Sequence, residues 1–215
     1  AARRGDLEGM RSAILSMIAD VRVSSTHRNR AREALGDELL RRGQREAARG
    51  FYDAARAEVI DDDAARNLDV KSYLTTGDER AALFGRLLVG RSSAEGAKDE
   101  VVPATIALAR FAAAGTGPSE DVALARYLLA RRLYDTHAYG DARQMLATAD
   151  VEALRRVTPR LVREAARIGI LLACFSESDV RSVQVAAALA RYREAPPANE
   201  GRRDAIERLA DRCAR

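Results

Sequence analysis

The chain has 215 residues, of which 47% are hydrophobic and 32% are charged, and this composition excludes intrinsic disorder. Its length permits one large domain or two small ones, and the dominance of Ala, Leu, Arg and Glu without any Trp favours an all-α fold. The net charge is +4, but acidic and basic residues alternate along every predicted helix, so nucleic-acid binding is disfavoured.

Nearly all of the basic residues are arginine, since Lys71 and Lys98 are the only lysines. This bias is typical of a GC-rich bacterial genome. No stretch approaches the roughly 20 apolar residues of a membrane span, and no signal peptide is visible. Because the sequence starts at Ala1 rather than Met, we expect a fragment or the mature part of a longer protein. The expected compartment is the cytoplasm, or the periplasm if the chain is a processed mature form.

Apolar residues at helical spacing predict six helices in the first half of the chain. Residues 24–26 offer hydroxyl caps, Gly43 supplies a left-handed residue that ends a helix cheaply, and the acidic run 61–63 favours a helix N-terminus. Pro103 is tolerated only in the first turn of its helix. The predicted helices span residues 6–21, 27–42, 44–60, 64–76, 79–89 and 98–114.

Six more helices are predicted after the break at residues 115–118, where Gly and Pro cluster. Ser119 is expected to cap the first of them. The terminal helix lies within residues 195–215 and is expected to cover the last apolar face of the fold, with dimerisation or contact with a membrane surface as alternatives. These helices span residues 119–135, 139–149, 150–157, 160–175, 179–193 and 200–215.

The two cysteines, Cys174 and Cys213, do not form a disulfide framework. Cys174 follows an apolar run and is expected to be a buried thiol. A disulfide between the two is possible only if the chain is exported.

No catalytic or metal-binding pattern stands out. His27 and His137 lie at predicted helix ends, where capping or exposure is expected. The acidic run 61–63 is more typical of a helix cap than of a metal site. Glu33 and Asp37 are four residues apart on one helix face, a spacing usual for surface carboxylates. We therefore expect a protein that is not an enzyme and needs no metal or cofactor.

The strongest pattern is an internal repeat, in which Gly9, Gly43 and Gly77 follow one another at intervals of 34 residues. Small and large residues alternate around the second glycine where two helices would touch: Leu35, Gly36, Leu39, Ala48, Tyr52 and Ala55. This skeleton resembles the tetratricopeptide repeat (TPR), a two-helix unit of 34 residues. Arg32 and Ile60 depart from the family, which often has Trp and Pro at these positions. The resemblance is best over residues 6–90 and 119–150.

The repeat register after residue 97 stays open. Leu129, Ala130, Ala142 and Ala149 fit a repeat in which helix 119–135 comes first, but the same helix also fits as a second helix. Residues 115–130 further show a weak similarity to the related Sel1-like repeat.

The resemblance implies one domain over residues 1–215, a right-handed α-α superhelix or TPR-like solenoid of about 11–12 helices. Its first helices would line a concave groove that binds a peptide or partner protein. The acidic Glu33 and Asp37 disfavour a ligand held by its terminal carboxylate. The groove positions carried over from the family are Arg30, Glu33, Asp37, Arg41, Asn67, Lys71, Leu74, Thr75, Tyr127, Arg131 and Tyr134.

The expected function is therefore that of a scaffold for protein–protein interaction, with self-association possible. The alternative is a helical accessory or sensing domain of a larger bacterial enzyme or regulator. Replacing Lys71 and Tyr127 by alanine is expected to weaken partner binding without unfolding the protein.

Overall fold

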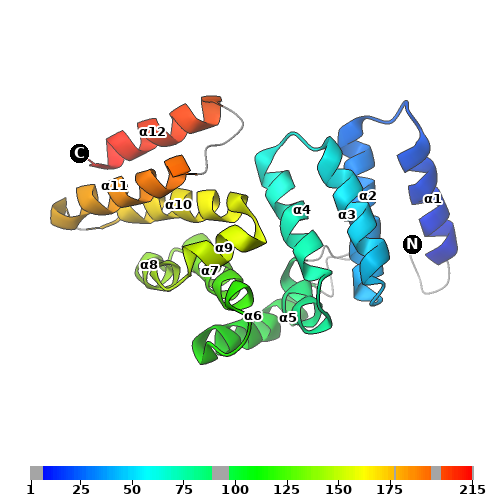
Figure 1. Ribbon diagram of the computed structural model, residues 1–215, viewed down its shortest axis with the longest axis horizontal. Coiled ribbons are helices and arrows are strands. Elements are labelled where there is room, and N and C mark those ends of the chain that lie inside the picture. Colours follow the sequence, from blue (N-terminus) through cyan, green and yellow to red (C-terminus); the bar gives the residue numbers. More distant parts are fainter. Residues whose placement is uncertain (1–6, 89–96, 177, 195–199, 215) are drawn as a thin grey trace. The chain divides into compact units, whose positions relative to one another are not determined.

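The computed structural model describes residues 7–88, 97–176, 178–194 and 200–214, and within these ranges it contains helices and no strand (Figure 1). The all-helical prediction is confirmed. The helices are α1 (Leu7–Ala19), α2 (Ser25–Arg41), α3 (Arg45–Glu58), α4 (Asp62–Leu74), α5 (Asp78–Leu88), α6 (Ala97–Ala114), α7 (Ser119–Asp135), α8 (Tyr139–Ala147), α9 (Val151–Val157), α10 (Pro159–Ala173), α11 (Ser178–Glu194) and α12 (Glu200–Ala214).

Most of the predicted helix signals are found where the sequence placed them. The Ser24 side chain accepts a hydrogen bond from the amide of His27 and caps α2. Asp61 does the same for α4 by accepting from the Ala64 amide at 2.8 Å. Gly43 ends α2 with φ of 74°, a conformation that glycine adopts without steric cost. Local hydrogen-bonding chemistry therefore determines where these helices begin and end.

Two helix signals were wrong. Ser119 is the first residue of α7 rather than its cap; Pro118 holds the capping position and no side chain caps the helix. Pro103 lies inside α6, which begins at Ala97, although the sequence allowed this proline only in the first turn. An interior proline removes one backbone hydrogen bond, and the helix continues through it.

The chain divides into two compact units, residues 1–104 and 105–215, with the division inside α6. The single solenoid over residues 1–215 stays a prediction.

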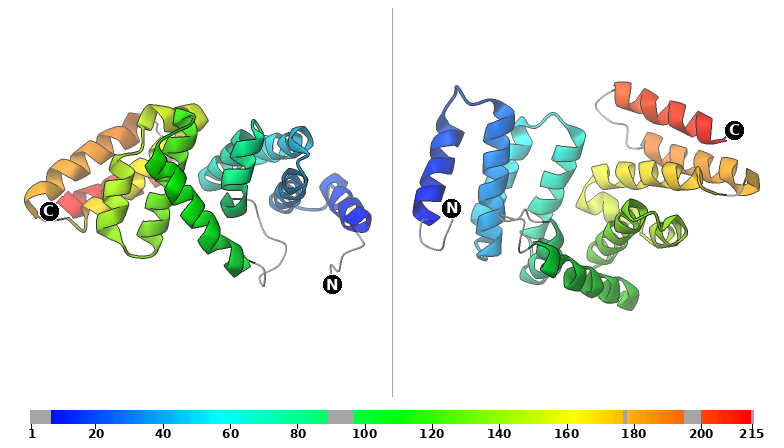
Figure 2. Two further views of the ribbon diagram at one scale, coloured as in Figure 1. Left: turned by 90° about the horizontal axis from the view of Figure 1, so that it is seen from below. Right: turned by 180° about the vertical axis from the view of Figure 1, so that it is seen from behind.

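In the first unit, α2 packs against α3 and α3 against α4, and Figure 1 and the right panel of Figure 2 show the three helices side by side. The contact between α2 and α3 is the predicted one. Leu35, Ala48, Tyr52 and Ala55 are buried. A Cβ atom built on Gly36 would lie 2.5 Å from a Tyr52 ring carbon, so only glycine lets the two helices approach this closely.

In the second unit, α7 packs against α8, and α10 packs against α11 and α12. α12 contributes Ile206 and Ala210 to an apolar cluster with residues of α10 and α11. The terminal helix thus covers an apolar face inside its own unit. The rest of this cluster consists of Ala166, Ile170, Ala173, Val185, Ala188 and Tyr192.

The two cysteines are joined in a disulfide, so the expectation of a buried thiol was wrong. Cys174 is the residue that ends α10, and Cys213 lies in the last turn of α12. The packing of α12 on α10 brings them to a Cα–Cα distance of 4.9 Å. The apolar run before Cys174 reflects the burial of α10, and it says nothing about a partner 39 residues away in the chain.

Candidate interaction surface

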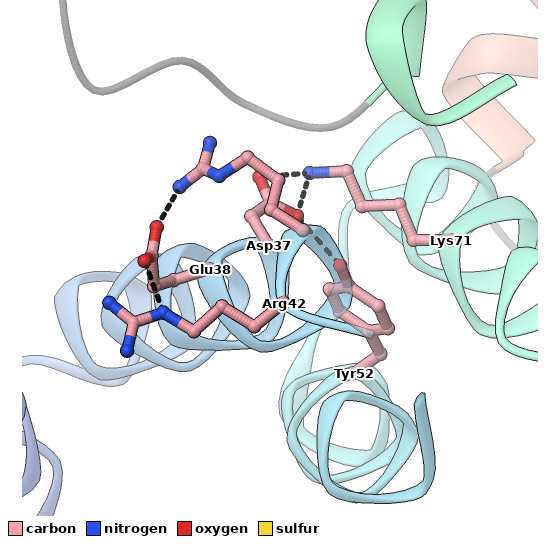
Figure 3. A network of polar contacts seen from close by, with 6 residues as sticks. Asp37, Glu38, Arg42, Tyr52 and Lys71 are labelled. Atoms are coloured by element: carbon pink, nitrogen blue, oxygen red, sulfur yellow. Dashed lines mark hydrogen bonds and ion pairs between the residues drawn. The ribbon is translucent and has the colours of Figure 1, made fainter. Parts of the chain in front are cut away.

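A network of charged and polar side chains joins α2, α3 and α4 in the first unit (Figure 3). The Lys71 ammonium on α4 donates to the Glu33 carboxylate at 2.6 Å and to the Asp37 carboxylate at 2.9 Å, both on α2. The Tyr52 hydroxyl on α3 donates to Asp37 at 2.9 Å. The predicted groove residues Glu33, Asp37 and Lys71 are therefore brought together.

Burial makes this network important for the fold. Asp37 is 4% exposed and Lys71 is 6% exposed. Charges removed from water in this way are tolerated when they are paired and hydrogen-bonded. Burial, and then the Asp37 carboxylate, raise the pKa of Tyr52 far above its ordinary value, so Tyr52 stays a neutral donor. The network links three helices through their polar groups.

The C-terminal end of α2 carries a more exposed ion-pair cluster. Glu38 accepts hydrogen bonds from Arg41 at 2.6 Å and from Arg42 at 2.7 Å, and Figure 3 shows Glu38 and Arg42 on the side of α2 away from Tyr52. Burial opposes the charged form of Glu38, but the two guanidinium groups outweigh it, so the pKa of Glu38 is lowered. Arg41 thus has a partner on its own helix.

A hollow of about 340 Å³ opens at the other end of α2. Its wall combines the N-terminal half of α2, the last residue of α3 with the turn that follows it, and the first half of α4. The residues that line it are Ser25, Thr26, Asn29, Arg30, Glu33, Glu58, Val59, Ile60, Asp61, Ala64 and Leu68. Arg30 and Glu33, which the repeat register assigned to the concave face, are both part of this wall.

The remaining predicted groove residues of the first unit divide into exposed and buried ones. Arg41 and Asn67 are exposed. Leu74 has no exposed surface, and Thr75 is 6% exposed. The Thr75 hydroxyl donates a hydrogen bond to the carbonyl of Ser72, one of the carbonyl groups in the last turn of α4. Leu74 and Thr75 therefore belong to the packing of the unit.

The three predicted residues of the second unit lie on α7. Tyr127 is 1% exposed, whereas Arg131 and Tyr134 are half-buried. Burial opposes the charge of Arg131, but Tyr127 and Glu164 of α10 outweigh it, so the pKa of Arg131 is raised. The Glu164 carboxylate of α10 therefore favours the charged form of Arg131 on α7.

The burial of Lys71 and Tyr127 argues against the expectation that both can be replaced by alanine without loss of stability. Both side chains are buried, and Lys71 neutralises a buried carboxylate. The positions were selected by repeat register, which gives the direction of a side chain but not what the neighbouring helix places over it. Arg30 is exposed and suits such a test better.

Sequence reasoning missed two features. The first is the contribution of the α3–α4 turn to the hollow, because α3 was expected to run to about Ile60, whereas it ends at Glu58 and leaves Ile60 98% exposed. The second is an aromatic cluster in which Tyr139 stacks on Phe175 with ring centroids 4.1 Å apart, beside Tyr134 at 5.7 Å from Tyr139. The only sequence observation that pointed to the α3–α4 turn was Ile60 itself, which stands where the repeat family often has proline.

Searches of protein-family models, curated proteins and solved structures found no match to this chain. Across the described ranges, no helix combines the length and apolar character needed to cross a membrane. In the same ranges, no group of three or more His, Cys, Asp or Glu side chains is placed to hold a metal ion.

Proposed function

We propose that this chain is a TPR-like helical-repeat protein that binds a partner protein through a peptide segment of that partner. The observation that carries the proposal is the hollow beside α2 and α4. The 34-residue register assigns these as the first helices of neighbouring repeats, whose facing surfaces form the ligand groove in this kind of fold. Arg30 and Glu33 line the hollow as the register requires.

The turns of the two units support the repeat assignment. After α2, the amides of Gly43 and Gln44 donate to the carbonyls of Leu40 and Leu39. After α7, the amides of residues 137 and 138 donate to the carbonyls of residues 134 and 133 in the same pattern. Ala48 and Ala142, each five residues after its turn residue, have no exposed surface. This similarity favours α7 as a first helix and α8 as its second.

The proposal is tested by selecting random displayed peptides against the whole chain. A recovered peptide is then titrated into the isotope-labelled protein, and the backbone amide chemical shifts are followed. We expect the shift changes to centre on residues 25–33 and 58–68. Failure to enrich any peptide over an unrelated immobilised protein, or shift changes confined to other surfaces, would count against the proposed function.

We also propose that the protein works in an oxidising compartment, such as the periplasm. The Cys174–Cys213 disulfide supports this, because such bonds persist where thiols are not continually reduced. This proposal is tested by alkylating free thiols in cells before lysis and measuring the mass of the intact protein by mass spectrometry. We expect no alkylated cysteine in this chain, and a doubly alkylated chain would contradict the proposal.

A further inference from the structure

We propose that the hollow binds the main chain of an extended peptide segment, with the Asn29 side-chain amide donating a hydrogen bond to one of its carbonyl oxygens. The inference rests on the proposed function and specifies how that same site holds its ligand. Recognition of this kind uses groups that every peptide carries, so the charge of the ligand is secondary.

Asn29 is a buried polar residue in the wall of the hollow, at 7% exposure. Its side-chain oxygen Oδ1 accepts a hydrogen bond from Nη1 of Arg32 at 2.8 Å. A guanidinium group donates and does not accept, so the other polar atom of this amide is the donor nitrogen Nδ2. Nδ2 donates to no residue that the structure describes. Because buried polar groups are normally paired, Asn29 offers an oriented donor to a ligand that supplies an acceptor.

The charges of the wall do not select a charged ligand. The wall carries three carboxylates and one guanidinium group, that of Arg30. Two of the carboxylates, Glu33 and Glu58, already pair with basic residues outside the wall, at 2.6 and 2.8 Å. The third, Asp61, and Arg30 carry opposite charges, so an acidic or a basic ligand meets attraction from one and repulsion from the other. An uncharged acceptor such as a peptide carbonyl binds the Asn29 donor without this conflict.

The turn between α3 and α4 offers main-chain groups to the same ligand. Its backbone is extended at Val59, with φ of −84° and ψ of 129°, and at Asp61, with φ of −66° and ψ of 127°. Val59 and Ile60 both line the hollow, and their backbone groups make no hydrogen bond within the part of the chain that the structure describes. An extended peptide beside such a segment can exchange N–H and C=O hydrogen bonds with it, as a strand added to a sheet edge does. The hollow thus combines a side-chain donor with open main-chain groups.

The first test exchanges one atom of Asn29. Asn29→Asp keeps the size of the side chain and an oxygen for Arg32, but it replaces the Nδ2 donor by a second acceptor. We expect this variant to bind a peptide selected against the whole chain about fivefold more weakly, the usual contribution of one hydrogen bond. Asn67→Asp is the matched control, because Asn67 is exposed, lies outside the wall and receives the same substitution. The control should bind the peptide as the parent does.

The second test changes the peptide and leaves the protein as it is. Each main-chain amide of the peptide is replaced in turn by an ester, which removes the N–H group and makes the carbonyl a weaker acceptor. We expect at least one ester to bind the parent chain about fivefold more weakly. The same ester should cost less affinity with Asn29→Asp, because the donor that its carbonyl accepts from is already gone.

Three results would overturn main-chain recognition while leaving peptide binding intact. The first is equal binding by the parent and Asn29→Asp, and the second is full affinity for every ester peptide. The third is a loss for Asn29→Asp that has the same size with every ester peptide, which would mean that the added charge acts alone. If selection yields no peptide, the proposed function itself fails.

Discussion

At the scale of single residues, the contact between α2 and α3 depends on the missing side chain of Gly36. Its backbone lies so close to Tyr52 that a methyl group would overlap the ring, at 2.5 Å from one carbon and 2.8 Å from the next. Tyr52 has no room to move aside, since it is fully buried and its hydroxyl is bound to Asp37. The small residue at this position is therefore required by packing.

Two glycine-to-alanine substitutions should have opposite effects on stability. In a helix interior, alanine is favoured over glycine by about 1 kcal/mol. At Gly50, on the exposed face of α3, an added Cβ meets nothing within 4 Å, so Gly50→Ala should stabilise the protein by up to about that amount. At Gly36 the overlap costs about 1–3 kcal/mol and outweighs the gain.

Urea unfolding of the two variants beside the parent measures both effects. A higher midpoint for Gly50→Ala with a lower one for Gly36→Ala is the expected result. If the two variants had the same urea midpoint, the close approach of α2 and α3 at Gly36 would be contradicted.

Lys71 should matter for folding more than its place on a groove-facing helix suggests. Lys71→Met removes the ammonium partner of the buried Asp37 carboxylate, and breaking a buried pair from one side costs about 3 kcal/mol. Lys71→Met combined with Asp37→Asn should recover part of this loss, because the unpaired negative charge is gone while the amide oxygen still accepts from Tyr52.

The measurement is the free energy of unfolding of the two single variants, the double variant and the parent. The cycle gives the coupling energy between residues 37 and 71. A coupling energy of zero would mean that the two side chains do not interact in the folded protein.

At the scale of elements, the turns that follow α2 and α7 use the same backbone conformation with different residues. Gly43 has φ of 74° and His137 has φ of 66°. Left-handed backbone costs a residue with a side chain about 1 kcal/mol, and glycine avoids that cost. No atom lies within 4 Å of a Cβ built on Gly43, so the cost of a substitution there is conformational alone.

Gly43→Ala should therefore destabilise the protein by about 1 kcal/mol, and His137→Gly should stabilise it by somewhat less. The gain at residue 137 is reduced because the His137 ring also contacts Tyr139 edge-on, with centroids 5.8 Å apart. Thermal unfolding of both variants provides the measurement. A His137→Gly variant less stable than the parent would show that the ring contact exceeds the backbone strain.

Helix existence could be read from the sequence because periodicity and caps are local. Ser24 and Asp61 were predicted at helix starts and form caps there, since the side chain and the amides it accepts from are separated by three residues. For Pro103 and Ser119 the helix was predicted but its first residue was misplaced, at Lys98 instead of Ala97 for α6 and after Ser119 instead of at it for α7. Helix ends are less sharply defined by local sequence than helix interiors.

At the scale of the whole chain, the sequence predicted the α2–α3 contact but not which groove positions stay accessible. The repeat register placed Glu33, Asp37 and Lys71 on facing helices, and they do meet. The repeat register could not show that Lys71 is buried and paired with both carboxylates. This pairing depends on the side chains of α2, about 34 residues earlier in the chain. The hollow likewise depends on the early end of α3 at Glu58, which exposes Ile60.

The disulfide joins residues from two helices that are not neighbours in the sequence, α10 and α12. It closes a loop between residues 39 apart, and in the chain-entropy description such a bond contributes about 4 kcal/mol. α12 buries Ile206 and Ala210 and packs the partly buried Leu209 against the same cluster, and the full burial of one isoleucine or leucine is worth about 1.5–3 kcal/mol. The covalent bond and the packing of α12 are therefore of similar importance.

Reduction should consequently release α12 before it unfolds the rest of the chain. We expect a phosphine reductant to increase hydrogen exchange first in residues 200–214, and then in the parts of α10 and α11 whose apolar cluster α12 covers. Cys213→Ser should show the same pattern without reductant, and reductant should not change it further. Peptides from residues 7–88 provide the internal control, because they contain no cysteine. Unchanged exchange in residues 200–214 would mean that packing alone holds α12 in place and that the disulfide contributes little to its docking.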